Sequence, residues 1–129
     1  MRTIKFRGLR IGLEGFAYGL PDYYEMYDEW GIGDYAVDED TIDQFTGLYD
    51  KNGNEIYEGD IVEINTKGII SKEAKRILVV EWYQEECKYV LSDENSDDYG
   101  CDELTSLFIK RKNLKVIGNI HDNPKLFKQ

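Results

Sequence analysis

The chain has 129 residues, a mass of 15.1 kDa and 41% apolar residues, which suits one domain, or a domain with a small appendage, with a hydrophobic core and excludes disorder throughout. No apolar run approaches the roughly 20 residues that span a bilayer, and no signal sequence is apparent, so we expect a cytoplasmic protein with no membrane partner. The net charge of −10 disfavours nonspecific DNA binding, which depends on Lys and Arg contacting phosphates.

The charge is distributed unevenly along the chain. Residues 1–20 carry four bases and one acid, whereas residues 21–60 carry thirteen acids and one base. Residues 91–109 carry six acids and no base, and residues 110–129 carry six bases and one acid. The basic ends and acidic middle segments could pair within one fold. Alternatively, the acidic segments form an exposed anionic surface that attracts a cationic protein.

The first predicted element is a β-hairpin. Residues 3–9 alternate apolar and basic side chains, as in a half-buried strand, and a second short strand around residues 16–18 is closed by Gly19 and Pro21. Residues 22–44 fit a short helix about as well as a loop that packs its aromatic rings inward. We therefore assign them no regular structure.

An aromatic and acidic cluster in residues 22–44 is the candidate partner-binding site. Tyrosine and tryptophan are favoured at protein interfaces, and neighbouring carboxylates would select a basic partner. The alternative is that the same rings simply cover the core. The candidate residues are Tyr23, Tyr24, Tyr27, Trp30 and Tyr35.

A second hairpin follows, with strands at residues 43–49 and 55–57 joined by an Asn-Gly turn. A glycine corner at Gly59 then leads into an alternating strand that reaches residue 64, a pattern typical of the first strand of a small barrel. We interpret the distinctive residues of this region as a structural turn motif rather than a convergent acidic site. They are Gly47, Asp50, Asn52, Gly53, Glu58, Gly59 and Asp60.

The remaining elements are a third hairpin and a C-terminal helix. The hairpin pairs residues 76–83 with residues 88–91, and an acidic loop follows at residues 92–103. Apolar segments at residues 104–109 and 114–120 flank a basic run. A proline at position 124, preceded by an asparagine, predicts a short helix at the C-terminal end.

Catalytic and ligand motifs are incomplete throughout the sequence. Gly31–Ala36 is similar to a dinucleotide fingerprint but lies among carboxylates and outside a strand–turn–helix pattern. Stretches beginning at Asp50 and Asp93 lack the sixth-position glycine and twelfth-position glutamate of a calcium loop. His121 is the sole histidine, and neither cysteine lies in a motif. We predict no catalytic residue, no metal site, no cofactor and no enzyme.

Four stretches, in order along the chain, resemble the YopX family of small phage and prophage proteins from Gram-positive bacteria. They are Ile4–Gly8 (IKFRG), Gln44–Val62 (QFTGLYDKNGNEIYEGDIV), Val80–Trp82 (VEW) and Val116–Leu126 (VIGNIHDNPKL). The resemblance implies a β-rich, phage-encoded cytoplasmic protein of the bacterial host cell. It implies no biochemical activity, and it transfers no catalytic or binding residue.

We expect a mainly β fold, α+β at most. Residues 1–42 would form an N-terminal β extension that carries the aromatic and acidic segment. Residues 43–129 would form a small barrel, which the resemblance to the YopX family implies is SH3-like, with an acidic loop and a short C-terminal helix. The exposed edges of such a barrel would permit self-association into a homo-oligomer.

Two functions are compatible with these features. The first is a noncatalytic phage accessory protein that binds a host or phage protein, in its boldest version by mimicking DNA. The second is a module that binds single-stranded nucleic acid with the small barrel and local basic patches. Those patches comprise Arg2, Lys5, Arg7, Arg10 and the run from Lys110 to Lys115.

Overall fold

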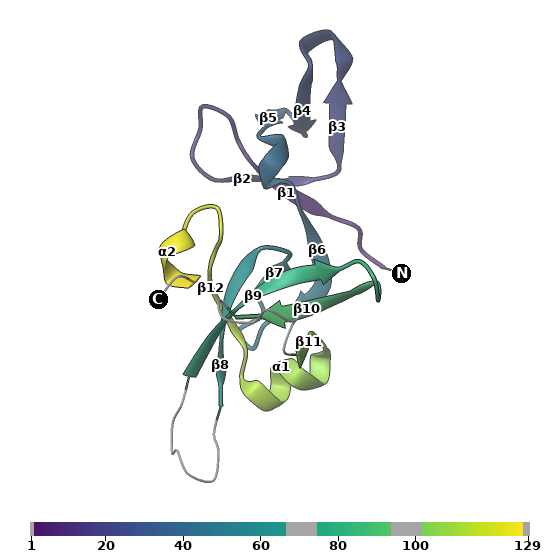
Figure 1. Ribbon diagram of the computed structural model, residues 1–129. Helices are drawn as coiled ribbons and strands as arrows, with labels where there is room; N and C mark the ends of the chain where they lie inside the picture. Colours follow the sequence, from purple (N-terminus) through teal and green to yellow (C-terminus); the bar gives the residue numbers. More distant parts are fainter. Residues whose placement is uncertain (1, 67–74, 94–101, 128–129) are drawn as a thin grey trace. The chain divides into compact units, whose positions relative to one another are not determined.

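Figure 1 shows the computed structural model, which describes residues 2–66, 75–93 and 102–127. The chain forms two compact units, residues 1–47 and 48–129. They divide within strand β6 (Asp43–Tyr49), whereas the sequence predicted a boundary just before this strand. Cys101, most of the acidic loop and most of the calcium-like stretch after Asp93 lie outside the described residues.

The N-terminal unit begins with the predicted hairpin, which is confirmed. Strand β1 (Phe6–Leu9) pairs antiparallel with β2 (Phe16–Gly19) and, through its first two residues, with the start of β6. This pairing brings Arg7 to Asp43, with the arginine Nε 3.1 Å from the carboxylate Oδ2 and both side chains buried. The ion pair therefore fixes the first strand to the strand that leaves the unit.

Residues 22–44, which the sequence left without regular structure, form a small antiparallel sheet in the order β3-β4-β5. Its elements are β3 (Pro21–Tyr24), the 3-10 turn η1 (Glu25–Tyr27), β4 (Glu29–Ile32), β5 (Tyr35–Val37) and the 3-10 turn η2 (Glu39–Thr41). Asp28 ends η1 in the left-handed region, with a φ of 48° that a short polar side chain tolerates. Gly33, with a φ of 61°, turns the chain from β4 into β5.

The core of the N-terminal unit is small. It consists of Ala17, Ile32 and Val37, with Trp30 and Ile42 packed against them. Because side chains alternate along a strand, Trp30 and Ile32 share the core face of β4, and Gly31 lies on the opposite face. The sheet thus buries one side of its central strand.

The C-terminal unit contains a five-stranded antiparallel sheet in the order β11-β10-β9-β8-β12 (Figure 1). The predicted strands in this region are confirmed. The elements are β7 (Glu55–Tyr57), β8 (Asp60–Asn65), β9 (Lys75–Tyr83), β10 (Lys88–Ser92), β11 (Asp102–Glu103), α1 (Ser106–Lys112), β12 (Lys115–Asn119) and α2 (Pro124–Phe127). Before this sheet begins, the end of β6 and β7 form the predicted second hairpin.

One face of this sheet carries the main core, which α1 covers. The buried members are Ile56, Val62, Ile64, Leu78, Val80, Leu91, Leu104, Ile109 and Leu114. Thr105 caps the start of helix α1, where its Oγ1 accepts a hydrogen bond from the N–H of Phe108 at 3.1 Å, and Asn113, with a φ of 49°, caps its end. These two caps explain why a short apolar segment becomes a helix.

The mainly β fold is confirmed, but the expected closed barrel is absent from the described residues. Their strands form three sheets, and none closes on itself. A barrel requires its first and last strands to pair, whereas β11 and β12 remain the two edges of the five-stranded sheet. The predicted C-terminal helix is present as α2. No helix of the described chain is long and apolar enough to cross a membrane.

Candidate interaction surface

The residues of β3, η1 and β4, positions 21–32, form a hairpin that we call the aromatic hairpin. At its tip, Met26 is 86% exposed and Tyr27 is 72% exposed, and both Tyr23 and Tyr24 are 45% exposed. Single exposed apolar residues are normal on a protein surface, but four neighbouring ones on a single hairpin are not. The hairpin is therefore the candidate interaction surface.

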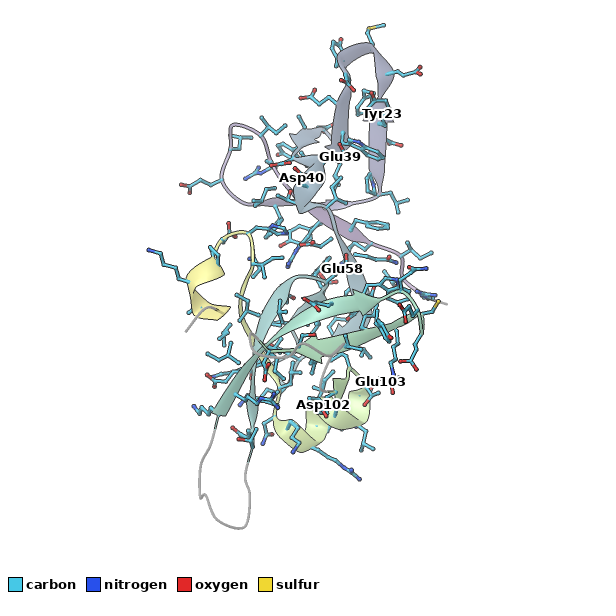
Figure 2. All side chains as sticks on the ribbon, viewed as in Figure 1. Tyr23, Glu39, Asp40, Glu58, Asp102 and Glu103 are labelled. Carbon is cyan, nitrogen blue, oxygen red and sulfur yellow. The ribbon has the colours of Figure 1, made fainter. Side chains whose placement is uncertain are left out.

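Tyr23 is held in place on the hairpin by two contacts. Its ring lies 5.4 Å from that of Trp30, its cross-strand partner, and its hydroxyl donates a hydrogen bond to the carboxylate of Asp28. This hydrogen bond raises the pKa of Tyr23, and partial desolvation and the negative charges of Asp28 and Glu39 add to the effect. Glu39 belongs to the same unit as Tyr23, and both residues are labelled in Figure 2. The phenol consequently stays protonated and donates at neutral pH.

Tyr24 lies on the opposite face of the same strand, over Gly31. A Cβ at Gly31 would approach the ring atom Cε2 of Tyr24 to 2.8 Å and the carbonyl oxygen of Tyr35 to 3.2 Å. The absence of a side chain at Gly31 thus lets the Tyr24 ring lie against the backbone of the neighbouring strand. Each face of the hairpin carries one half-exposed tyrosine.

The five predicted aromatic residues take different positions. Tyr23, Tyr24 and Tyr27 lie on the exposed part of the hairpin, whereas Trp30 packs against the core. Tyr35 lies on β5, where the guanidinium of Arg10 is 4.8 Å from its ring centroid. Sequence reasoning missed Met26, although it interrupts the run of predicted tyrosines.

The surroundings of the hairpin are acidic. Residues 21–47 contain nine acidic residues and no Lys or Arg. One of the nine, Asp43, is buried against Arg7. The exposed carboxylates are Asp22, Glu25, Asp28, Asp34, Asp38, Glu39 and Asp40, of which Glu39 and Asp40 are labelled in Figure 2.

The basic residues of the chain are mostly engaged by their own unit. In the N-terminal unit, Lys5 lies over the ring of Phe45, Arg7 is buried, and Arg10 donates to the carbonyl of Glu14. In the C-terminal unit, Lys115 lies 3.4 Å from the carboxylate of Glu63. The most exposed bases of the second run are Lys110 and Arg111, at the end of α1.

Within the turn motif, Asp50 acts as a hydrogen-bond acceptor. Its Oδ1 accepts from the N–H groups of Asn52 and Asn54, both at 2.9 Å, and its Oδ2 accepts from the N–H of Val116 at 2.9 Å and the side-chain amide of Asn54 at 3.2 Å. Burial tends to raise the pKa of Asp50, but these hydrogen bonds outweigh it and hold the pKa below its ordinary value. The Asp50 carboxylate therefore has a structural role, as an ionised hydrogen-bond acceptor.

Other residues of the turn motif also stabilise the local backbone conformation. Asp60 is buried and accepts from the N–H of Tyr57 at 2.7 Å, and Glu58 is half-buried in the corner before it (Figure 2). Gly47, Gly53 and Gly59 have φ values of 87°, 83° and 85°, which favour glycine. In the described ranges, no group of three His, Cys, Asp or Glu is arranged to hold a metal ion.

His121 lies in the turn before α2, where its N–H donates to the side-chain oxygen of Asn119 at 3.0 Å. Cys87 is exposed at the turn between β9 and β10. Both residues belong to the C-terminal unit, whereas the aromatic hairpin belongs to the N-terminal unit.

The sequence model of the family described as YopX protein matches residues 19–128. The chain belongs to the YopX family. The matched range includes the whole aromatic hairpin and the whole Asp50 turn, so both features lie within the YopX part of the chain. The resemblance inferred from the four sequence stretches is thereby confirmed.

The YopX chain is also similar to a solved structure, the crystal structure of protein EF1440 from Enterococcus faecalis. The two sequences are 26% identical, the TM-score is 0.62, and the alignment covers 98% of this chain and 99% of that chain. No curated protein matches the sequence. The comparison supports a fold shared over nearly the full length of both chains.

Proposed function

We propose that this YopX-family protein is a noncatalytic phage or prophage accessory protein that binds another protein in the host cytoplasm. The observation that carries the proposal is the exposure of Met26 and Tyr27 at the tip of the aromatic hairpin. Neither side chain belongs to the core of its unit, which Ile32 and Val37 form on a different part of the sheet. Exposed apolar groups that the fold does not use are typical of interfaces.

The charge around the hairpin supports a basic partner surface. Exposed carboxylates on both sides of the tip produce a negative potential, which would accelerate encounter with a cationic protein and repel nucleic acid. The aromatic rings would supply the buried contacts and the carboxylates would form the rim. Binding should therefore weaken with added salt without disappearing, because aromatic contacts are not screened.

A second candidate, the binding of single-stranded nucleic acid, is favoured by Lys110 and Arg111, which are exposed on the last turn of α1. These cations also complement the negative end of the helix dipole, which gives them a structural role. Titration of labelled oligonucleotides at low salt, followed by fluorescence anisotropy, tests this candidate. An unchanged anisotropy at high micromolar protein would exclude it.

Site-specific photo-crosslinking tests the first proposal. The photoreactive residue benzoylphenylalanine replaces Tyr27 in one variant and Leu107 in a matched control. Leu107 is also exposed and apolar, but it lies on α1. In bacterial cells that express the protein, irradiation should give a discrete protein adduct at position 27 and not at position 107. The absence of an adduct at position 27, or the same adducts at both positions, would overturn the proposal.

A further inference from the structure

We propose that the partner binds as an extended basic segment that pairs with the free edge of β3 and places two consecutive cationic side chains against Tyr23 and Tyr24. This inference rests on the proposed function, because it names the chemistry of the partner at the same hairpin. It also specifies how the partner is held, which exposure alone does not.

Strand β3 lies at an edge of its sheet. In the described part of the chain, β3 is hydrogen-bonded to β4 alone. The opposite edge, β5, is continued by the segment after β1, since the N–H of Ile11 donates to the carbonyl of Ala36 and the N–H of Asp38 donates to the carbonyl of Leu9, both at 2.9 Å. An edge strand presents a row of backbone donors and acceptors that an extended peptide can complete.

The charge of the β3 edge complements a basic segment. The edge strand and its turn carry Asp22, Glu25 and Asp28, and no Lys or Arg occurs anywhere in residues 21–47. An acidic or neutral strand would meet uncompensated carboxylates, whereas a basic strand would neutralise them. The same charge discourages two copies of this hairpin from pairing with each other.

Elsewhere in the same unit, arginine side chains lie over aromatic rings. The guanidinium of Arg10 lies 4.8 Å from the ring centroid of Tyr35, and that of Arg7 lies 4.5 Å from the ring centroid of Phe16. Cations over aromatic faces are attracted by the ring quadrupole. In the described part of the chain, the rings of Tyr23 and Tyr24 carry no such cation. They remain free to receive one from a partner.

The geometry of a strand pair determines which side chains of an added strand would meet the two tyrosines. Successive residues of a strand point to opposite faces, so Tyr23 and Tyr24 lie on different faces of the hairpin. Side chains of paired residues lie on the same face, so two consecutive residues of the added strand would each meet one ring. Two adjacent Arg or Lys residues are therefore the expected recognition element.

The tyrosines are also held in position before a partner arrives. Tyr23 is fixed by its contacts with Trp30 and Asp28, and Tyr24 rests over Gly31. Side chains that are already ordered lose less conformational entropy on binding. This arrangement suits recognition by a preformed surface.

A set of short peptides tests the proposal against the full-length protein. The probe is the fluorescein-labelled peptide Thr-Val-Arg-Arg-Val-Thr, followed by fluorescence anisotropy. Two further versions carry N-methyl groups on alternate amides, one on the odd and one on the even positions, and a fourth replaces both arginines with glutamate. We expect the arginine peptide to bind, the glutamate peptide not to bind, and one N-methylated version to lose about tenfold or more in affinity. Only one should lose it, because only alternate amides face the edge.

Protein variants complete the test. Tyr24→Ser should weaken binding of the arginine peptide about fivefold or more, as expected for the loss of a cation–aromatic contact. Glu103→Gln, which removes an exposed charge from β11 in the C-terminal unit, serves as the control and should change affinity less than twofold. Equal binding of all N-methylated peptides, or unchanged binding by Tyr24→Ser, would overturn the edge-strand inference. A crosslink at position 27 would then still support the proposed function, whereas its absence would reject both.

Discussion

The carboxylate of Asp50 accepts a hydrogen bond from the backbone N–H of Val116, 66 residues later in the chain and 2.9 Å away. The N–H of the next residue, Lys51, donates to the carbonyl of Leu114 at 3.0 Å. Together these bonds fasten the turn after β6 to the start of β12. The segment Asp50–Asn54 (DKNGN) therefore stabilises its own turn through local hydrogen bonds and also forms a long-range contact with the start of β12.

Replacement of this carboxylate should destabilise the protein. In Asp50→Asn, one of the two acceptor oxygens becomes an amide donor, and at least one partly buried N–H loses its partner. We expect the free energy of unfolding to fall by about 2–3 kcal/mol, measured by urea denaturation. Asp34→Asn is the matched control, and it should change stability by less than about 0.5 kcal/mol. An Asp50→Asn variant as stable as the control would contradict the role given to this residue.

The stabilising effect of Asp50 should depend on pH. Its pKa in the folded protein lies below the ordinary value of 3.8, so protonation favours the unfolded chain. The contribution of the ionised Asp50 carboxylate to the free energy of unfolding is fully present at neutral pH. It is lost as the pH falls below about 4, towards the lowered pKa. The difference in unfolding free energy between the wild type and Asp50→Asn should therefore shrink across this acidic range. A constant difference between pH 7 and pH 3 would be incompatible with this ionisation.

The buried pair of Arg7 and Asp43 should show strong energetic coupling. Asp43→Ala leaves the Arg7 guanidinium buried without this carboxylate, at a cost of about 3–5 kcal/mol. In the double variant with Arg7→Met, the buried charge is gone as well, so the loss should be smaller than the sum of the two single losses. Urea denaturation of the four proteins gives the coupling free energy. Additive losses, within about 0.5 kcal/mol, would show that the pair is not coupled.

Gly31 should be required for the position of Tyr24. In Gly31→Ala, the new Cβ would lie 2.8 Å from the Tyr24 ring, so we expect the ring to move and stability to fall by about 1 kcal/mol. In a Tyr24→Ser background the same alanine should cost clearly less, because the ring that it meets is absent. Thermal unfolding of the single and double variants measures this difference. An equal loss of stability in both backgrounds would contradict this role of the Tyr24 ring and would point to the contact with the carbonyl oxygen of Tyr35 instead.

The hairpins with clear turn chemistry could be predicted from the sequence. The Asn-Gly pair and the β-branched run in β9 gave the correct type and order of strands, because these signals are local. The β3–β4 hairpin could not be predicted in the same way. Its tyrosines at positions 23, 24 and 27 also fit a helical spacing. The cross-strand contact between Tyr23 and Trp30 exists only in the paired strands and cannot be read from that spacing.

The open arrangement of the sheets could not be read from local patterns either. A glycine corner before an alternating strand occurs at Gly59 as expected, but closure depends on which strands become edges, and this is a long-range property. The candidate site was predicted in part. The three hairpin tyrosines were identified from composition, whereas the exposure of Met26 and the inward position of Trp30 follow only from the fold.

The most direct test of the central claim is a quantitative capture experiment. Tagged wild type, a Met26→Ser/Tyr27→Ser variant and a Leu107→Ser control are incubated with nuclease-treated host lysate, and bound proteins are quantified by mass spectrometry. The account predicts a specific protein that the wild type and the control retain equally and that the hairpin variant loses by about tenfold or more, with all three proteins equally folded. Equal retention by the hairpin variant would contradict the claim that the aromatic hairpin binds the partner.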